Sequence, residues 1–270
     1  MEEIKCDSWE DFESKLKNLY ELRSGLKTGS SSHVSGWLFR GQANHEWKLT
    51  TTLERFRSHT ISLLEYYRII SRSKNEIETF IGTSWEIPSY LEYEKWLDEV
   101  RPPRLFDLPA YNYMAYLRHH GFPSPLLDWT LSPYIAAFFA FNKASDEWEY
   151  VSIYSFLEYA GKSKLSTPSE SNIFTPGPYV KTDKRHFLQQ SGYTFCAKLK
   201  NNQIYHYAKH DEVVARGDEN QDLMKKYIIP SKEKIKVLKQ LEKYNINPFS
   251  LFNSEESLMD TIATREFFLK

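Results

Sequence analysis

Arg40 is the first residue whose type and position suggest chemistry. It follows the apolar run Trp37-Leu38-Phe39 and stands directly before Gly41. The run predicts a short buried strand that ends at the glycine. A guanidinium holds phosphate or ribose oxygens in a fixed fork, and a glycine lets the backbone approach a ligand closely. Arg40 is therefore a candidate for binding a phosphate-bearing ligand.

Further candidates for acid–base chemistry lie between residues 119 and 130, namely His119, His120 and Asp128. Each also has a structural interpretation. Asp128 could pair with Arg40 and tie two strands together, or help to start the helix that follows. The histidines precede Gly121 and could close a helix, because a histidine there meets the helix C-terminus favourably.

The elements that must position these residues follow from apolar spacing and from turn residues. Helices are predicted over residues 7–22, capped by Asp7 or Ser8, and over 58–81, 108–120, 133–140 and 232–244. Strands are predicted at 37–41, 126–130, 149–157, 193–197 and 227–230. Residues 82–107 give no clear pattern, and 161–178 read as a loop that could gate a site. We expect one α+β domain over residues 1–270, beginning with a helical segment at 1–30.

Composition limits the class of protein. The chain of 270 residues has a formal net charge of -1 and 16% aromatic residues. It can therefore bury a large core, and it lacks the excess of positive charge of a basic nucleic-acid scaffold, although a local basic patch could hide within the neutral total.

The two cysteines show no metal-ligand spacing, so no metal is expected. We find no apolar segment long enough to span a bilayer, and we expect a cytoplasmic protein without a membrane partner.

Four segments in order resemble the FRG domain family, which is named for the tripeptide Phe39-Arg40-Gly41. They are residues 37–49, residues 119–140, residues 185–195 and residues 228–252. The chain differs from the usual family pattern at His120, where Tyr is common. It differs again at Ser124-Pro125, where Thr-Arg is common. The role of that arginine would be missing here, or would pass to Arg118 or Arg185.

The FRG family in turn resembles a distant branch of the ADP-ribosyltransferases. This implies a mixed or antiparallel sheet core flanked by helices, and NAD as a substrate. Arg40 would hold the nicotinamide ribose and the phosphates, supported by Thr130 or Ser132. Trp129 would stack on nicotinamide, although tryptophans more often serve in packing.

The third motif of active transferases usually supplies a Glu, whereas this chain has Gln189 and Gln190. An amide can bond ribose but stabilises a cation poorly, so acid–base work would pass to Asp128, His119 or His120. The glutamines could equally satisfy buried backbone groups. The implied catalytic residues are Arg40, Asp128, Thr130 and Gln190. The implied NAD-binding residues are Arg40, Gly41, His119, His120, Trp129 and Gln189.

The resemblance implies an NAD-dependent ADP-ribosyltransferase, a toxin or antiphage-defence effector that modifies RNA, DNA or protein. Such an effector would have a neutralising, antitoxin-like partner. Two alternatives stay open. An NAD glycohydrolase would share the site but use water as acceptor, and a non-catalytic module would recognise nucleic acid or protein. The absent carboxylate favours the latter.

Overall fold

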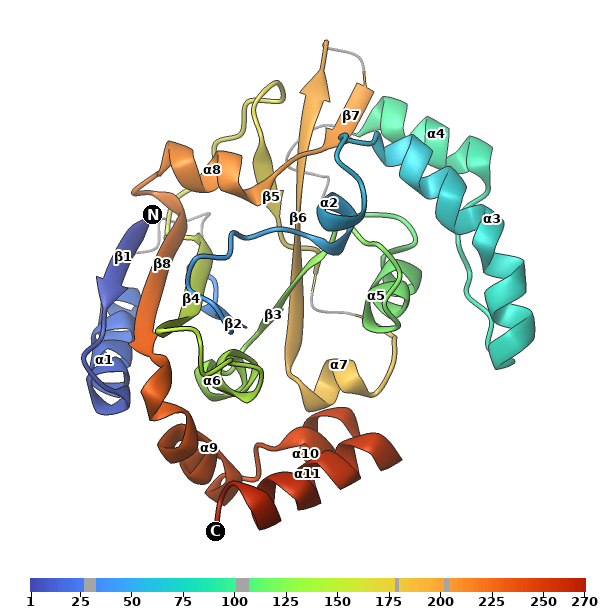
Figure 1. The fold of residues 1–270 in the computed structure, drawn as a ribbon. Coiled ribbons are helices and arrows are strands. Elements are labelled where there is room, and N and C mark those ends of the chain that lie inside the picture. Colours follow the sequence, from blue (N-terminus) through green and yellow to red (C-terminus); the bar gives the residue numbers. More distant parts are fainter. Residues whose placement is uncertain (27–32, 101–106, 178–179, 202–203) are drawn as a thin grey trace.

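The computed structural model describes residues 1–26, 33–100, 107–177, 180–201 and 204–270. Its centre is an eight-stranded sheet with the strand order β1-β8-β4-β2-β3-β6-β5, and β7 pairs with β6 (Figure 1). The strands are β1 (Glu2–Lys5), β2 (Leu38–Gln42), β3 (Leu127–Thr130), β4 (Tyr150–Tyr159), β5 (Asn172–Phe174), β6 (Ser191–Lys200), β7 (Ile204–Tyr207) and β8 (Gln221–Pro230). β1 runs parallel to β8, and the other pairs are antiparallel.

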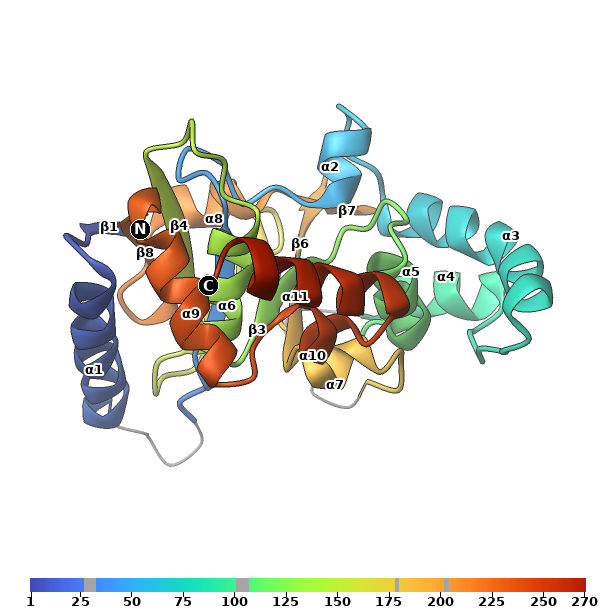
Figure 2. The ribbon, with the colours of Figure 1, turned by 60° about the horizontal axis from the view of Figure 1, so that its bottom comes forward.

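Helices surround this sheet (Figure 2), so the predicted α+β class with a mixed sheet is confirmed. They are α1 (Trp9–Gly25), α2 (Thr52–Phe56), α3 (Leu63–Ile81), α4 (Tyr90–Glu99), α5 (Tyr111–His119), α6 (Pro133–Asn142), α7 (Arg185–Leu188), α8 (His210–Arg216), α9 (Lys234–Lys243), α10 (Pro248–Phe252) and α11 (Glu255–Phe267). The predicted helical segment 1–30 contains β1 and α1, and residues 27–30 lie outside the described part of the chain.

Polar caps fix the starts of two helices near the sheet. Ser8, one of the two predicted caps, accepts a hydrogen bond from the backbone N–H of Asp11 at the start of α1. At α6, Ser132 is the cap and Pro133 holds the first helical position. The interpretation of Asp128 as a helix start is therefore wrong, because Asp128 lies within β3, one turn before the actual cap.

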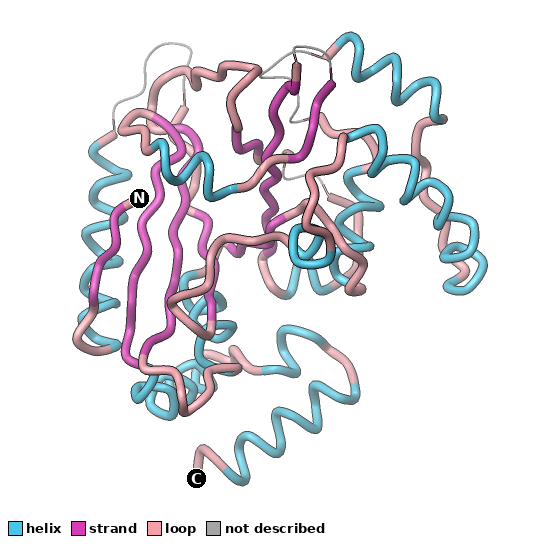
Figure 3. The backbone as a smooth tube through the Cα atoms, turned by 45° about the horizontal axis from the view of Figure 1, so that its top comes forward, coloured by secondary structure: helices cyan, strands magenta, loops and turns pink. Residues whose placement is uncertain are grey.

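The sheet consists of two groups of strands that meet at a narrow seam (Figure 3). One group is β1, β8, β4 and β2, and the other is β3, β6, β5 and β7. Across the seam, the register joins β2 to β3 at a single residue pair, Phe39 and Thr130. Beyond this pair the two strands separate and are no longer paired by backbone hydrogen bonds.

Helix α6 packs closely against β2 at Gly41. A Cβ atom on this residue would lie 1.8 Å from the carbonyl oxygen of Ala136 and 2.7 Å from the backbone nitrogen of Ala140. Both atoms belong to α6, so helix packing requires the glycine. The sequence predicts that the glycine allows close approach to a ligand, and the structure adds packing against α6 as a second reason for it.

The predicted loop over residues 161–178 contains β5 and is tied to the sheet; residue 178 lies outside the described residues. The buried ammonium of Lys164 bonds Glu158 at 3.0 Å and Asp222 at 2.6 Å. The side-chain amide of Gln221 bonds both the N–H and the carbonyl of Leu165. These contacts argue against a mobile gate, and the described part of the loop does not line the pocket around Arg40.

Candidate functional site

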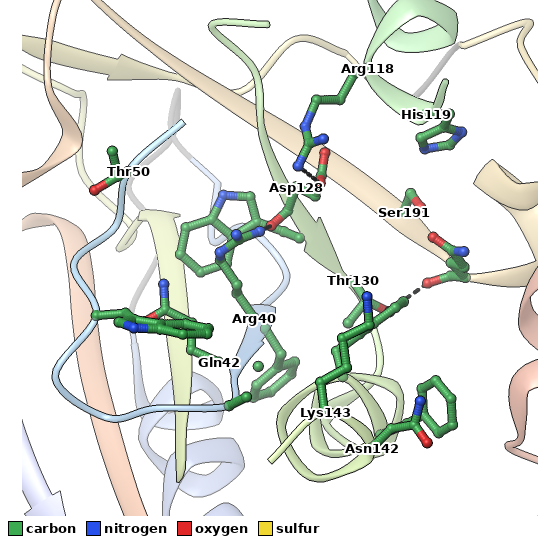
Figure 4. A pocket seen from close by; sticks show the side chains of 18 of the residues that line it. Arg40, Gln42, Thr50, Arg118, His119, Asp128, Thr130, Asn142, Lys143 and Ser191 are labelled. Carbon is green, nitrogen blue, oxygen red and sulfur yellow. Dashed lines mark hydrogen bonds and ion pairs between the residues drawn. The ribbon is translucent and has the colours of Figure 1, made fainter. Parts of the chain in front are cut away.

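A pocket of about 930 Å³ opens where β2 and β3 separate. Figure 4 shows Arg40 and Thr130 on its strands and Arg118 at one end, away from Asn142 and Lys143. Its walls come from β2, β3, α2, α5, α6, α7 and α10, which are far apart in sequence. Its size suits a nucleotide-sized ligand. Of the predicted site residues, the pocket is lined by Arg40, Gly41, His119, Asp128, Trp129, Thr130 and Gln189.

Arg40 projects from β2 and makes one hydrogen bond, from Nη1 to the backbone carbonyl of Asp128 at 2.7 Å. Its Nε is buried and has no hydrogen-bond partner among the residues that the structure describes. Among the described residues no carboxylate forms an ion pair with it. Burial lowers the pKa of Arg40 to about 10, so the guanidinium remains charged at neutral pH. One of its five N–H groups is thus used by the protein.

The predicted pairing of the Arg40 and Asp128 side chains is wrong, although the two residues do tie the strands together. The register that pairs Phe39 with Thr130 would bring Gly41 opposite Asp128 if the strands stayed together. Because they separate, the carbonyl of Asp128 loses its strand partner. The guanidinium of Arg40 replaces that partner.

The Asp128 carboxylate pairs with Arg118 of α5 instead. Oδ2 takes part in this ion pair, while Oδ1 is buried and has no hydrogen-bond partner within the described part of the chain. Arg118 and Arg185, the two predicted substitutes for the family's arginine, both line the pocket. Arg118 is thus the residue that orients the acidic group of the site.

Thr130 and Ser132 do not support Arg40 as expected. The hydroxyl of Thr130 donates to the backbone carbonyl of Gln189 at 2.7 Å and accepts from the N–H of Ser132. Ser132 caps α6. Thr130 occupies the paired position at the seam, where its side chain joins β3 to the turn after α7.

Trp129 is a packing residue. It is 3% exposed, and its ring centroid lies 5.5 Å from that of Phe156. Its indole N–H donates to the hydroxyl of Thr194, which also bonds Nε2 of His210 at 2.8 Å. Because the indole is committed to these contacts, the packing interpretation is supported over the expected stacking on nicotinamide.

The two histidines both end α5, as their structural interpretation predicted. His119 lines the pocket, and its Nε2 lies 2.7 Å from the hydroxyl of Tyr193. Burial lowers the pKa of His119, so its ring is neutral at pH 7. His120 lies against the ring of Tyr116 and outside the lining of the Arg40 pocket, so the structure does not bring it together with the other predicted NAD-binding residues. At the C-terminus of α5, the His119 ring therefore faces the pocket and the His120 ring packs against Tyr116.

The two glutamines also separate. Gln189 lines the pocket and its amide donates to the backbone carbonyl of Leu251 at 3.2 Å, as the alternative interpretation expected. Gln190 adopts a left-handed conformation with φ of 47° and lines a different cavity of about 530 Å³. The structure therefore does not bring Gln190 into the Arg40 pocket, because the chain turns between the two residues.

The sequence interpretation missed much of the positive charge of the pocket. Its cationic residues are Arg40, Lys48, Arg55, Arg118, Lys143 and Arg185, and its acidic residues are Glu46 and Asp128. Within the described ranges, Arg55, Lys143 and Arg185 have no ion-pair partner. A hidden basic patch was foreseen only in general terms. Its members are scattered between residues 40 and 185, and no spacing in the sequence reveals their convergence.

Comparison with known proteins identifies one family. The family model of the FRG domain matches residues 35–149, which include Arg40, Arg118 and Asp128. No curated protein and no solved structure matches the chain. In the part of the chain that the structure describes, no helix is both long and apolar enough to cross a bilayer. In that same part, no cluster of His, Cys, Asp and Glu could hold a metal ion.

Proposed function

This chain belongs to the FRG domain family through residues 35–149, and from that premise we propose that its pocket binds NAD and transfers ADP-ribose to a macromolecule. The proposal rests first on Arg40. Burying a guanidinium costs several kcal/mol unless other groups pair with it. Arg40 is charged and desolvated, yet among the described residues it bonds only one backbone carbonyl. A diphosphate or ribose oxygen would use its free N–H groups.

The charge of the pocket supports an anionic ligand. Six cationic residues line it against two acidic ones, and one of the acidic groups, Asp128, is already paired with Arg118. An excess of this kind attracts phosphate groups. The volume of about 930 Å³ is at the upper end of the range for small-molecule sites, as a dinucleotide requires.

In the proposed reaction, the bond between the ribose carbon and the nicotinamide nitrogen breaks. The electron pair leaves with nicotinamide, which becomes neutral, and positive charge develops on the ribose. Asp128 has an unpartnered Oδ1 that can stabilise this charge and take the proton of the attacking acceptor. Arg118 holds the carboxylate in place through Oδ2.

One observation favours a second candidate, a non-catalytic recognition module. The ion pair with Arg118 neutralises Asp128, and Glu46 is the other acidic residue of the lining among the described residues. A neutralised carboxylate stabilises a cation less well. Such a module would bind an anionic ligand in the same pocket without cleaving it.

Calorimetric titration with NAD tests the proposal, followed by chromatographic detection of nicotinamide. We expect the unaltered chain to bind NAD and release nicotinamide, and Arg40→Gln to lose both. Arg72→Gln, an exposed position on α3 outside the pocket, is the matched control and should behave as the unaltered chain. Binding without cleavage would select the recognition module. Release of free ADP-ribose without a labelled macromolecule would select the glycohydrolase. No affinity for NAD would refute the proposal.

A further inference from the structure

One end of the pocket combines aromatic, amide and cationic side chains. We call it the α6–α10 subsite, and it consists of Phe139, Asn142, Lys143, Arg185, Gln189 and Phe252. Figure 4 shows Asn142 and Lys143 side by side, away from Arg118. The Arg40 end already supplies Arg40 and Arg55 for the two phosphates of NAD, while Arg118 pairs with Asp128. The subsite therefore adds positive charge that the proposed substrate does not need.

Two aromatic rings form its apolar wall. The ring centroids of Phe139 and Phe252 lie 6.1 Å apart at an interplanar angle of 89°. The guanidinium of Arg185 lies over the Phe252 ring, 5.7 Å from its centroid. Both phenylalanines are partly exposed, although most of α6 is buried. Aromatic rings beside cations bind unstacked bases in single-stranded nucleic acids.

Two side-chain amides accompany the rings. Among the described residues, no group forms a hydrogen bond with the side chain of Asn142. Gln189 donates to the carbonyl of Leu251, which leaves its Oε1 free to accept. Carboxamides pair with the donor and acceptor edges of bases. The subsite can therefore hold a base by both its face and its edge.

The two cations complete a nucleotide site. Within the described ranges, Lys143 and Arg185 form no ion pair, so both are available to a phosphate. We infer that the α6–α10 subsite binds one nucleotide of a single-stranded nucleic acid, which is the acceptor of the proposed reaction. This inference rests on the proposed function. A duplex would not place a stacked base inside a pocket of this kind, so the acceptor base must be unstacked.

An acidic segment near Trp47 bears on the direction in which the strand leaves. Trp47, which lines the pocket, contacts Trp148 edge to face at 5.1 Å. Trp148 is flanked by Asp146, Glu147 and Glu149, all exposed. These carboxylates repel phosphates, so we expect the nucleic acid to leave on the side of Lys143 and Arg185.

The test measures binding without NAD, by fluorescence anisotropy of labelled single-stranded DNA and RNA of about ten nucleotides. We expect binding that weakens with salt. Lys143→Gln and Arg185→Gln should each weaken it, and each should reduce the slope of log K against log salt by about 0.7. Phe252→Leu, which keeps apolar volume, should weaken binding with little change of slope. Lys239→Gln is the control, because Lys239 is exposed on α9 outside the pocket. Comparing the binding of the DNA and RNA oligonucleotides shows whether the acceptor is DNA or RNA.

A second arm adds NAD labelled in its adenosine part. Transfer of label to the oligonucleotide, reduced in Lys143→Gln, would support the inference. Equal binding by all variants, or no binding, would overturn it. A parallel sample contains a cell lysate in place of the oligonucleotide. Label on lysate proteins alone would also overturn the inference, while the proposed transferase would stand. The oligonucleotide could bind in a way that depends on Lys143 and Arg185 while NAD stays intact. This result would support the nucleotide subsite but contradict the proposed transferase activity.

Discussion

Nη1 of Arg40 donates to the backbone carbonyl of Asp128 at 2.7 Å, across the point where β2 and β3 separate. This bond replaces the backbone hydrogen bond that the Asp128 carbonyl would otherwise accept from β2. It also holds the remaining N–H groups of the guanidinium beside a pocket with excess positive charge. The seam that weakens the sheet therefore also forms the candidate site.

Arg40→Met separates ligand binding from stability. Lowering the pKa of Arg40 from 12.5 to about 10 corresponds to a cost of about 3 kcal/mol for burying its charge. Loss of the bond to Asp128 costs about 1–3 kcal/mol, so the two effects nearly cancel. We expect the free energy of unfolding, measured in urea, to change by less than about 2 kcal/mol while NAD binding is lost. A much larger loss of stability would show that Arg40 serves mainly to stabilise the fold.

Gly41→Ala should be severely destabilising. The new methyl group would overlap the backbone of α6 at Ala136 and Ala140, which cannot move without shifting a buried helix. We expect a loss of more than about 3 kcal/mol in chemical unfolding. Gly25→Ala is the control, because nothing lies within 4 Å of a Cβ there. Equal stability of the two variants would contradict the close packing of α6 on β2.

His210 should make stability depend on pH. Complete burial lowers its pKa from 6.5 to about 3, so the folded chain keeps it neutral while the unfolded chain protonates it below pH 6.5. Its contribution is present above pH 6.5 and is lost at about 1.4 kcal/mol per pH unit as the pH falls toward 3. We expect the stability difference between the unaltered chain and His210→Gln to shrink accordingly between pH 6.5 and 5. A constant difference would show that His210 is not held neutral.

Thr194→Val tests the hydrogen bonds behind Trp129. The variant keeps the shape of the side chain but leaves the indole N–H of Trp129 and Nε2 of His210 without their shared partner. Unsatisfied buried groups cost about 1–3 kcal/mol each, so a loss of about 2–6 kcal/mol is expected in thermal unfolding. Thr194→Ser retains the hydroxyl and should lose less. If both variants lost the same amount, the hydroxyl would not matter.

Local patterns predicted much of the fold. The cap at Ser8 and the Ser132-Pro133 start of α6 are read from neighbouring residues, and both are confirmed. The strand that carries Arg40 is confirmed as well, but it runs through Gly41 to Gln42 and does not end at the glycine. Helix α4 was missed, although Ser89 and Glu92 form a capping box at its start. Its single fully buried residue, Tyr93, leaves a weak apolar stripe.

The site was less predictable, because its contacts join distant parts of the chain. Arg40 and Asp128 were both identified, but the sequence suggested a bond between their side chains. The pairing of Asp128 with Arg118 depends on where α5 ends relative to β3. The separation of Gln189 from Gln190 depends on a left-handed turn at Gln190, a conformation that glutamine rarely adopts. Such outcomes follow from tertiary structure alone.

The most direct test of the central claim is to incubate the purified chain with labelled NAD and a cell lysate, beside Arg40→Gln. Protease-treated and nuclease-treated fractions are compared, and released nicotinamide is measured. The account predicts nicotinamide release and label in a nuclease-sensitive fraction, both lost in Arg40→Gln. NAD left intact by the unaltered chain, or equal labelling by the variant, would contradict it.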